Sequence, residues 1–209
     1  MFMHNLNLNY SVQDPEKYLF NATFRYWNNH QPHWDYRGVL SNQDNPADYV
    51  DMVDLNSSDN QVPALDLYYQ RNLKNDQTLV FNVVGTYNRT SSHRFYQESR
   101  GEELLTDINN RVSGNKYSLI GEAIYEKKLT NGNRLSGGIR HTQSFSDNEY
   151  RNGHDYDTHM DQSESFLYGE FKGKVKKLDY TLGVGVSRSF YKQEGTDDSY
   201  QYYTFNPRF

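Results

Sequence analysis

The stretch from Thr78 to Phe145 constrains the fold more than any other part of the chain, because its side chains alternate in character over long distances. In residues 78–90 one set of alternate positions is apolar: Leu79, Phe81, Val83, Gly85 and Tyr87. The other set is mostly polar, and residues 116–128 and 134–145 repeat the pattern. A period of two predicts strands with two different faces. Each run exceeds the five or six residues of a usual globular strand.

Tight turns and long polar segments alternate along the chain. The segment Thr130–Asn133 contains Asn-Gly, the strongest short hairpin signal. Short turns are expected near residues 13–17, 74–77, 130–133 and 176–178, and long loops at 29–62, 91–114, 146–162 and, more weakly, 194–199. This asymmetry is typical of outer-membrane barrels. We therefore predict an all-β fold: an antiparallel up-and-down transmembrane β-barrel wall of about nine strands.

Composition supports a wall between lipid and water. The chain has 209 residues, is 35% hydrophobic and has a mean hydropathy of −1.00, yet it carries 19 Tyr and 11 Phe. High polarity with many aromatic residues fits a wet interior bounded by aromatic girdles. No run of about 18 apolar residues predicts a transmembrane helix. The net charge of −5 and the lack of a basic cluster argue against a nucleic-acid partner.

The alternation assigns side chains to the two faces. We predict that ten apolar residues lie on the convex, lipid-facing surface: Phe20, Phe24, Leu79, Phe81, Val83, Leu119, Leu135, Ile139, Leu182 and Val184. Glu122, Glu126 and Glu170 would then face the lumen, where charged groups tune selectivity.

Candidate chemistry is confined to the predicted loops. The best metal candidates are His154, Asp155, Asp157, His159 and Asp161, because oxygen-rich clusters can hold Ca²⁺. Their spacing matches neither an EF-hand nor a zinc motif, so a solvated loop is the expected reading. A ligand contact near Trp34 and an acidic group at Glu98, Glu102 and Glu103 have the same simpler explanation, with Trp34 as an interfacial anchor. We find no catalytic signature, and we expect neither an enzyme nor a cofactor site.

Five segments resemble the barrel strands of TonB-dependent receptor-like outer-membrane proteins: Leu65–Leu73, Asn82–Tyr87, Tyr117–Tyr125, Gly137–His141 and Thr204–Phe209. The resemblance extends over residues 1–209 and is strongest from Pro63 onward. It implies a bacterial outer-membrane barrel of about 22 strands closed around a plug, which imports a nutrient with energy passed through TonB. It implies no catalytic or ligand-binding residue.

The chain departs from the complete pattern of that family. It has no plug, no TonB-contact segment and too few strands, and Met1–His4 is not a signal peptide. We therefore expect residues 1–209 to be a partial barrel domain that continues beyond Phe209. The alternative is that Phe209 is a true aromatic C-terminus.

Two other functions remain open. A passive porin or structural outer-membrane barrel would have the same wall without the plug. A soluble carbohydrate-binding module would use Trp27, Trp34 and tyrosines as stacking platforms, and it would bury its apolar side chains between two packed sheets.

Overall fold

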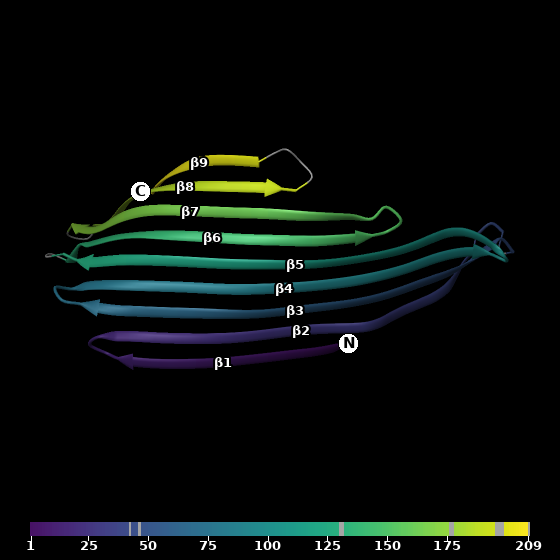
Figure 1. Ribbon diagram of the computed structural model, residues 1–209, viewed down its shortest axis with the longest axis horizontal. Helices are drawn as coiled ribbons and strands as arrows, with labels where there is room; N and C mark the ends of the chain where they lie inside the picture. Colours follow the sequence, from purple (N-terminus) through teal and green to yellow (C-terminus); the bar gives the residue numbers. More distant parts are fainter. Residues whose placement is uncertain (42, 46, 130–131, 176–177, 195–198, 209) are drawn as a thin grey trace.

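The computed structural model describes residues 1–209 except 42, 46, 130–131, 176–177, 195–198 and 209. The described residues form one antiparallel sheet of nine strands, each paired with the next along the chain (Figure 1). The strands are β1 (Phe2–Asp14), β2 (Tyr18–Ser41), β3 (Tyr49–Leu73), β4 (Gln77–Arg100), β5 (Glu103–Lys128), β6 (Arg134–Arg151), β7 (Tyr156–Val175), β8 (Leu178–Gln193) and β9 (Ser199–Arg208). The predicted up-and-down antiparallel fold is confirmed.

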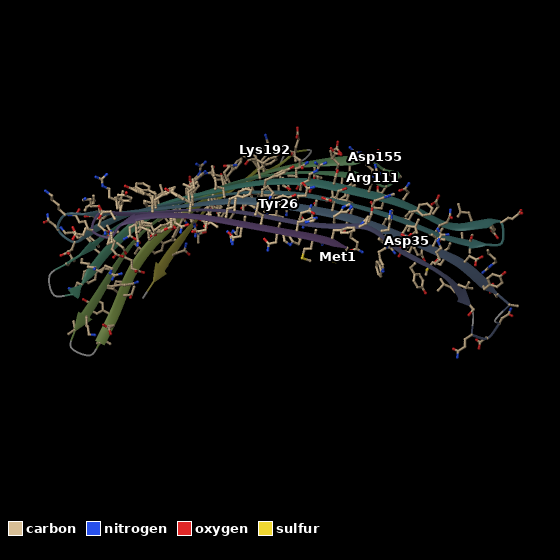
Figure 2. The ribbon with its side chains drawn as sticks, turned by 90° about the horizontal axis from the view of Figure 1, so that it is seen from below. Met1, Tyr26, Asp35, Arg111, Asp155 and Lys192 are labelled. Carbon is tan, nitrogen blue, oxygen red and sulfur yellow. The ribbon has the colours of Figure 1, made fainter. Side chains whose placement is uncertain are left out.

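The sheet is an open arch. Seen edge-on, it curves as one layer, with no second sheet beneath it in the described part of the chain (Figure 2). Within that part, β1 and β9 are its two edges, so the sheet does not close on itself. No helix in the described segments is long and apolar enough to cross a membrane.

Most of the predicted long loops are strands, so the predicted loop boundaries are wrong. Residues 29–62, 91–114 and 146–162 lie largely in β2 to β7, and β3 and β5 reach 25 and 26 residues. Between those strands the described residues 43–45, 47–48, 101–102 and 152–155 lie in turns, bends or irregular segments. The loops were predicted at these positions because their side chains are mostly polar. However, the ladder hydrogen bonds come from the backbone, and a strand with two wet faces keeps them.

The turns after β1 and β3 lie at one end of the strands, and the turns after β4 and β6 lie at the opposite end (Figure 1). The turns after β1 and β3 are confirmed. In the latter, three residues connect Leu73 with its ladder partner Gln77, and Asn75 and Asp76 have φ of 61° and 56°, a conformation that Asn and Asp tolerate better than most residues. The turn predictions at 130–133 and 176–178 and the loop prediction at 194–199 rest partly on residues outside the described ones, as does the prediction about Phe209.

A β-bulge in β2 changes which face its residues occupy. The pairing of β2 with β3 shifts by one residue between Gln31 and Trp34. One extra residue in a strand moves all later side chains to the opposite face. Trp34 therefore lies on the same face as Asn56, its partner in β3, and this is the polar face defined below.

Cross-strand pairing places the two kinds of side chain on opposite faces. Directly paired residues share a face, and the register joins all ten predicted outward residues on one side, here called the apolar face. On β8, Leu182 and Val184 of this face are 51% and 58% exposed, whereas Ser187 of the other, polar face is 8% exposed. Side chains crowd on the inside of a curve, so the apolar face is convex, as predicted.

The fold has no interior of the globular kind. No hydrophobic residue is buried in the described part of the chain. The ladder holds the strands together, and no second layer of the described chain covers the apolar side chains. The expectation of two sheets packed over these side chains, which the soluble-module alternative requires, is not met.

Candidate functional site

An apolar belt crosses the convex face. On β4 its residues run at alternate positions from Leu79 to Tyr87, and on β5 from Tyr117 to Tyr125. On β8 they run from Leu178 to Val186. Each run covers about nine residues, and a tilted strand needs about 9–11 to span the hydrocarbon of a bilayer.

The belt runs obliquely to the hydrogen-bond ladder. The ladder row through Ala22 is apolar or glycine across β2 to β5, passing through Leu67, Val83 and Gly121. The same row then meets polar residues on β6, β7 and β8: His141, Ser165 and Arg188. On these strands the belt lies nearer the short turns, from Leu167 to Val175 on β7.

The short turns are displaced by the same amount. The row that pairs Asp14 with Tyr18 at the first turn reaches β7 at Gly169, six residues before that strand ends at Val175. Six residues span about 20 Å, and the six strand intervals between these turns span about 29 Å. The ratio corresponds to a tilt of about 35°, as in outer-membrane barrels. Tilted by this angle, the short turns become level, and so do the belt centres on β2 and β8, at Ala22 and Leu182.

Aromatic residues border the belt. Tyr87 and Tyr117 stack at the border of the belt that lies farther from the short turns, with ring centroids 4.8 Å apart. The Tyr87 hydroxyl donates to Asn115 Oδ1 at 2.7 Å. At the edge near the turns, the Tyr125 hydroxyl donates to Gln77 Oε1 at 2.9 Å. Rings with one polar tip suit the boundary between acyl chains and headgroups.

The concave face carries charged pairs across from the belt. The register places Glu122, Glu126 and Glu170 on this polar face, so their predicted orientation is confirmed. Arg134 Nη1 lies 3.3 Å from Glu126, and Lys172 Nζ lies 2.9 Å from Glu170. These groups line a hollow of about 630 Å³ that extends across β5 to β9. A carboxylate paired in this way is suited to a wet, enclosed surface rather than to lipid.

A second polar network lies on the same face, in the strand extensions beyond the belt. Arg94 donates from Nε and Nη2 to the two carboxylate oxygens of Asp54, at 3.1 and 2.9 Å. The hydrogen bond from Arg94 is the largest of the influences that lower the pKa of Asp54. The Tyr96 hydroxyl donates to Glu98, and Thr106 donates to Glu98 at 3.0 Å. These contacts fix the extensions as sheet rather than loop.

Glu98 therefore does not form the acidic loop group considered from the sequence. Its carboxylate is occupied by Tyr96 and Thr106, whereas Glu102 lies in the turn between β4 and β5. Trp34 lies on the polar face, so the interpretation of Trp34 as a lipid-interface anchor is wrong.

The five candidate metal ligands make hydrogen bonds and ion pairs with several separate partners. His159 Nδ1 contacts Asp147, and Asp161 accepts from Gln143 Nε2 at 2.5 Å. Asp155 and Asp157 lie 3.8 and 2.5 Å from Arg151. His154 donates its backbone N–H to Asn152 at 3.4 Å. Within the described segments, no three His, Asp or Glu side chains form a group that could hold a metal ion.

The pKa of His159 is raised, chiefly by its hydrogen bond to Asp147 and further by the charges of Asp147, Glu194 and Asp161. Burial opposes this shift. Asp147 and Arg151, the partners of the candidate residues, lie on β6 and were not singled out from the sequence. The register of β6 with β7 identifies Asp147 as the partner of His159, and the ion pairs with Asp155 and Asp157 identify Arg151.

No protein-family profile and no curated protein sequence matches the chain. Among solved structures, it is similar to the ferripyoverdine receptor of the outer membrane of Pseudomonas aeruginosa, with 12% identity and a TM-score of 0.47 over 98% of this chain and 38% of the receptor. It is also similar to the ferric yersiniabactin uptake receptor FyuA from Yersinia pestis, with 13% identity and a TM-score of 0.44 over 97% and 35% of the two chains.

These structures are outer-membrane receptors of the class that the strand motifs resemble. The chain spans little more than a third of their length. A match to the beta domain of the Bordetella autotransporter BrkA covers 96% of this chain and 91% of that one, with 11% identity and a TM-score of 0.33.

Proposed function

We propose that the chain forms part of the wall of a β-barrel in a bacterial outer membrane, with its convex face against lipid. The oblique apolar belt carries this proposal. A tilt of about 35° brings the belt centres on β2 and β8 to the same level, and the same tilt brings the short turns level. A soluble protein gains nothing from an exposed apolar band of this width.

We further propose that residues 1–209 are a partial barrel domain. In the described sheet, β1 and β9 have one unpaired edge each, and an open edge in lipid leaves backbone N–H and C=O groups without partners. Further strands, to a total of about 22 by the family resemblance, would pair with these edges and enclose a space on the polar side.

The activity that fits this wall is receptor-type uptake of a nutrient, energised through TonB, with a plug inside the barrel. The sequence resemblance supports it, as does a concave face rich in paired charges. A passive pore built on the same wall is the alternative. The chain identifies neither a ligand nor a catalytic group.

The proposed membrane wall is tested by measuring which end of the strands is accessible from outside the cell. In the full-length protein, a short epitope placed at Gly101–Glu102 should be accessible to antibody on intact Gram-negative cells. An epitope at Pro15–Glu16 should become accessible only after the outer membrane is permeabilised. Recovery of the protein in the soluble fraction, or equal access to both epitopes, would contradict the proposal.

Energy dependence tests the activity. Uptake by cells that carry the full-length protein should stop when TonB is deleted or the proton gradient is collapsed, whereas a passive pore would continue to conduct small solutes. Uptake that is unaffected by both treatments would favour the passive pore and leave the wall itself intact.

A further inference from the structure

Two aromatic rings lie exposed on the concave face, at a level where the proposed wall leaves that face in water. The register places Trp34 and Tyr36 on this polar face, and they are 65% and 56% exposed. Trp34 shares a ladder row with Arg94, which lies seven positions beyond Tyr87 at the border of the belt, about 24 Å along the strand. Contact with lipid therefore does not account for the exposure of these rings.

The β-bulge in β2 brings both rings to this face. Without the extra residue between Gln31 and Trp34, the two rings would lie on the convex side. The far ends of β2 and β3 also bend toward the concave side of the arch (Figure 2). Bulges often re-aim a side chain next to a functional site, and here the bulge turns two rings toward the polar side.

A glycine makes room for the second ring. A Cβ built on Gly38 would lie 3.0 Å from both Cε1 and the hydroxyl oxygen of Tyr36. The Tyr36 ring therefore leans along its strand over Gly38, in space that the side chain of another residue would occupy. A larger residue at position 38 would displace the ring without removing it.

Each ring lies beside a planar polar side chain that can bind hydroxyl groups. Asn56 is the direct ladder partner of Trp34, and Asp54 is that of Tyr36. Arg94 and Asn56 fill three of the acceptor positions of Asp54, whereas a carboxylate offers about four. Asp54 can therefore accept a further hydrogen bond from a ligand.

The charges around the rings favour a neutral ligand. Arg94 lies 2.9 Å from a carboxylate oxygen of Asp54, and Arg100 at the far end of β4 lies 3.1 Å from Asp48. Each of these arginines therefore has its own carboxylate. An anionic ligand such as a phosphate or a carboxylate would need an unpaired cation, which neither arginine provides.

We propose that Trp34 and Tyr36 bind a neutral oligosaccharide at the outer end of the concave face. Sugar rings have apolar C–H faces that pack on aromatic rings, and hydroxyl rims that hydrogen-bond to amide and carboxylate groups. The two rings lie about 7 Å apart along one strand, so a chain of sugars fits them better than a single sugar. The inference names a substrate class for the proposed uptake, and it rests on the proposed location of these strand ends outside the membrane.

Four substitutions in the full-length protein test the site. Trp34→Ala and Tyr36→Ala each remove one ring, and Gly38→Val displaces the second ring while keeping it. Tyr49→Ala is the matched control, because Tyr49 lies on the convex face at the same end of the sheet and is 48% exposed. Heat-dependent gel mobility shows whether each variant folds.

The measurement is isothermal titration calorimetry of detergent-purified protein. The ligands are maltohexaose, cellohexaose, xylohexaose and mannohexaose, with hexagalacturonate as the anionic counterpart. We expect at least one neutral hexasaccharide to bind the wild type and Tyr49→Ala equally. Trp34→Ala and Tyr36→Ala should each bind it about tenfold more weakly, the effect of losing one stacked ring. Gly38→Val should also bind it more weakly, and Trp34→Phe, which keeps a ring, should restore most of the affinity lost in Trp34→Ala.

The sugar assignment is overturned if none of the four neutral hexasaccharides binds, or if hexagalacturonate binds more tightly than all of them. Equal binding by the ring variants and the control would overturn it as well. If uptake depends on TonB but these results fail, only the sugar assignment is lost. If the epitope at Gly101–Glu102 is not reached on intact cells, the proposed wall and the sugar site fail together.

Discussion

At the scale of single residues, Leu182 and Thr181 are neighbours with opposite environments. Leu182 lies at the middle of the belt on β8, and Thr181 faces the polar side next to Lys172. An arginine on the lipid face of a barrel costs about 2–4 kcal/mol near the midplane. We predict that Leu182→Arg lowers the amount of folded protein in the outer membrane and that Thr181→Arg has a smaller effect. Heat-dependent gel mobility measures this, and equal losses would contradict the two-faced wall.

His159 is a residue whose charge depends on its cross-strand neighbour. Its pKa is raised above the usual 6.5, chiefly by the hydrogen bond to Asp147. The protonated pair therefore stabilises the folded strands fully below pH 6.5, and this contribution is lost as the pH rises through the raised pKa. We predict that Asp147→Asn moves the pKa of His159 down, as measured by NMR titration of the ring.

The control for that titration is Asp155→Asn, since Asp155 pairs with Arg151 rather than with His159. A lower His159 pKa in the control, or an unchanged one in Asp147→Asn, would show that Asp147 is not the main cause.

At the scale of elements, the β3–β4 hairpin depends on a backbone conformation that few side chains accept. Asn75 and Asp76 both have positive φ. A branched side chain in this region costs about 1–2 kcal/mol, whereas glycine has no penalty. We predict that Asn75→Val lowers the urea midpoint of the full-length protein in lipid vesicles and that Asn75→Gly does not. Identical urea midpoints for the two variants would show that the backbone conformation of this turn does not contribute to the stability of the protein.

The strand extensions show where reasoning from element patterns fails. The alternation in residues 78–90 and 116–128 correctly predicted strands there, because one of their faces is apolar. Residues 91–100 and 103–114 are mostly polar on both faces and were assigned to a loop, yet β4 and β5 pair through them, with one irregularity at Glu98/Ser99. Cross-strand bonds such as that from Thr106 to Glu98 depend on register, which local polarity does not encode.

At the scale of the whole molecule, the tilt makes a prediction about depth. Phe24 and Phe190 lie on the same ladder row. A tilt of about 35° instead brings Phe24 level with Val184, six residues from Phe190. Spin labels at positions 24 and 184 of the full-length protein should show equal, high accessibility to oxygen in lipid bilayers. A label at 190 should show higher accessibility to a water-soluble nickel chelate. Equal depths for 24 and 190 would contradict the tilt.

Local sequence patterns were enough to predict the strand type, the short turns after β1 and β3, and the face of the ten apolar residues assigned to the convex surface. These features depend on neighbours within a few positions, and period-two alternation records them directly. The length of the strands, the side on which Trp34 lies and the offset of the belt between β2 and β8 follow from strand pairing instead. Each of these depends on the pairing of residues far apart in the chain. A single extra residue at the β2 bulge reverses a face, and a drift of one residue per strand becomes visible only when all the strands are placed side by side.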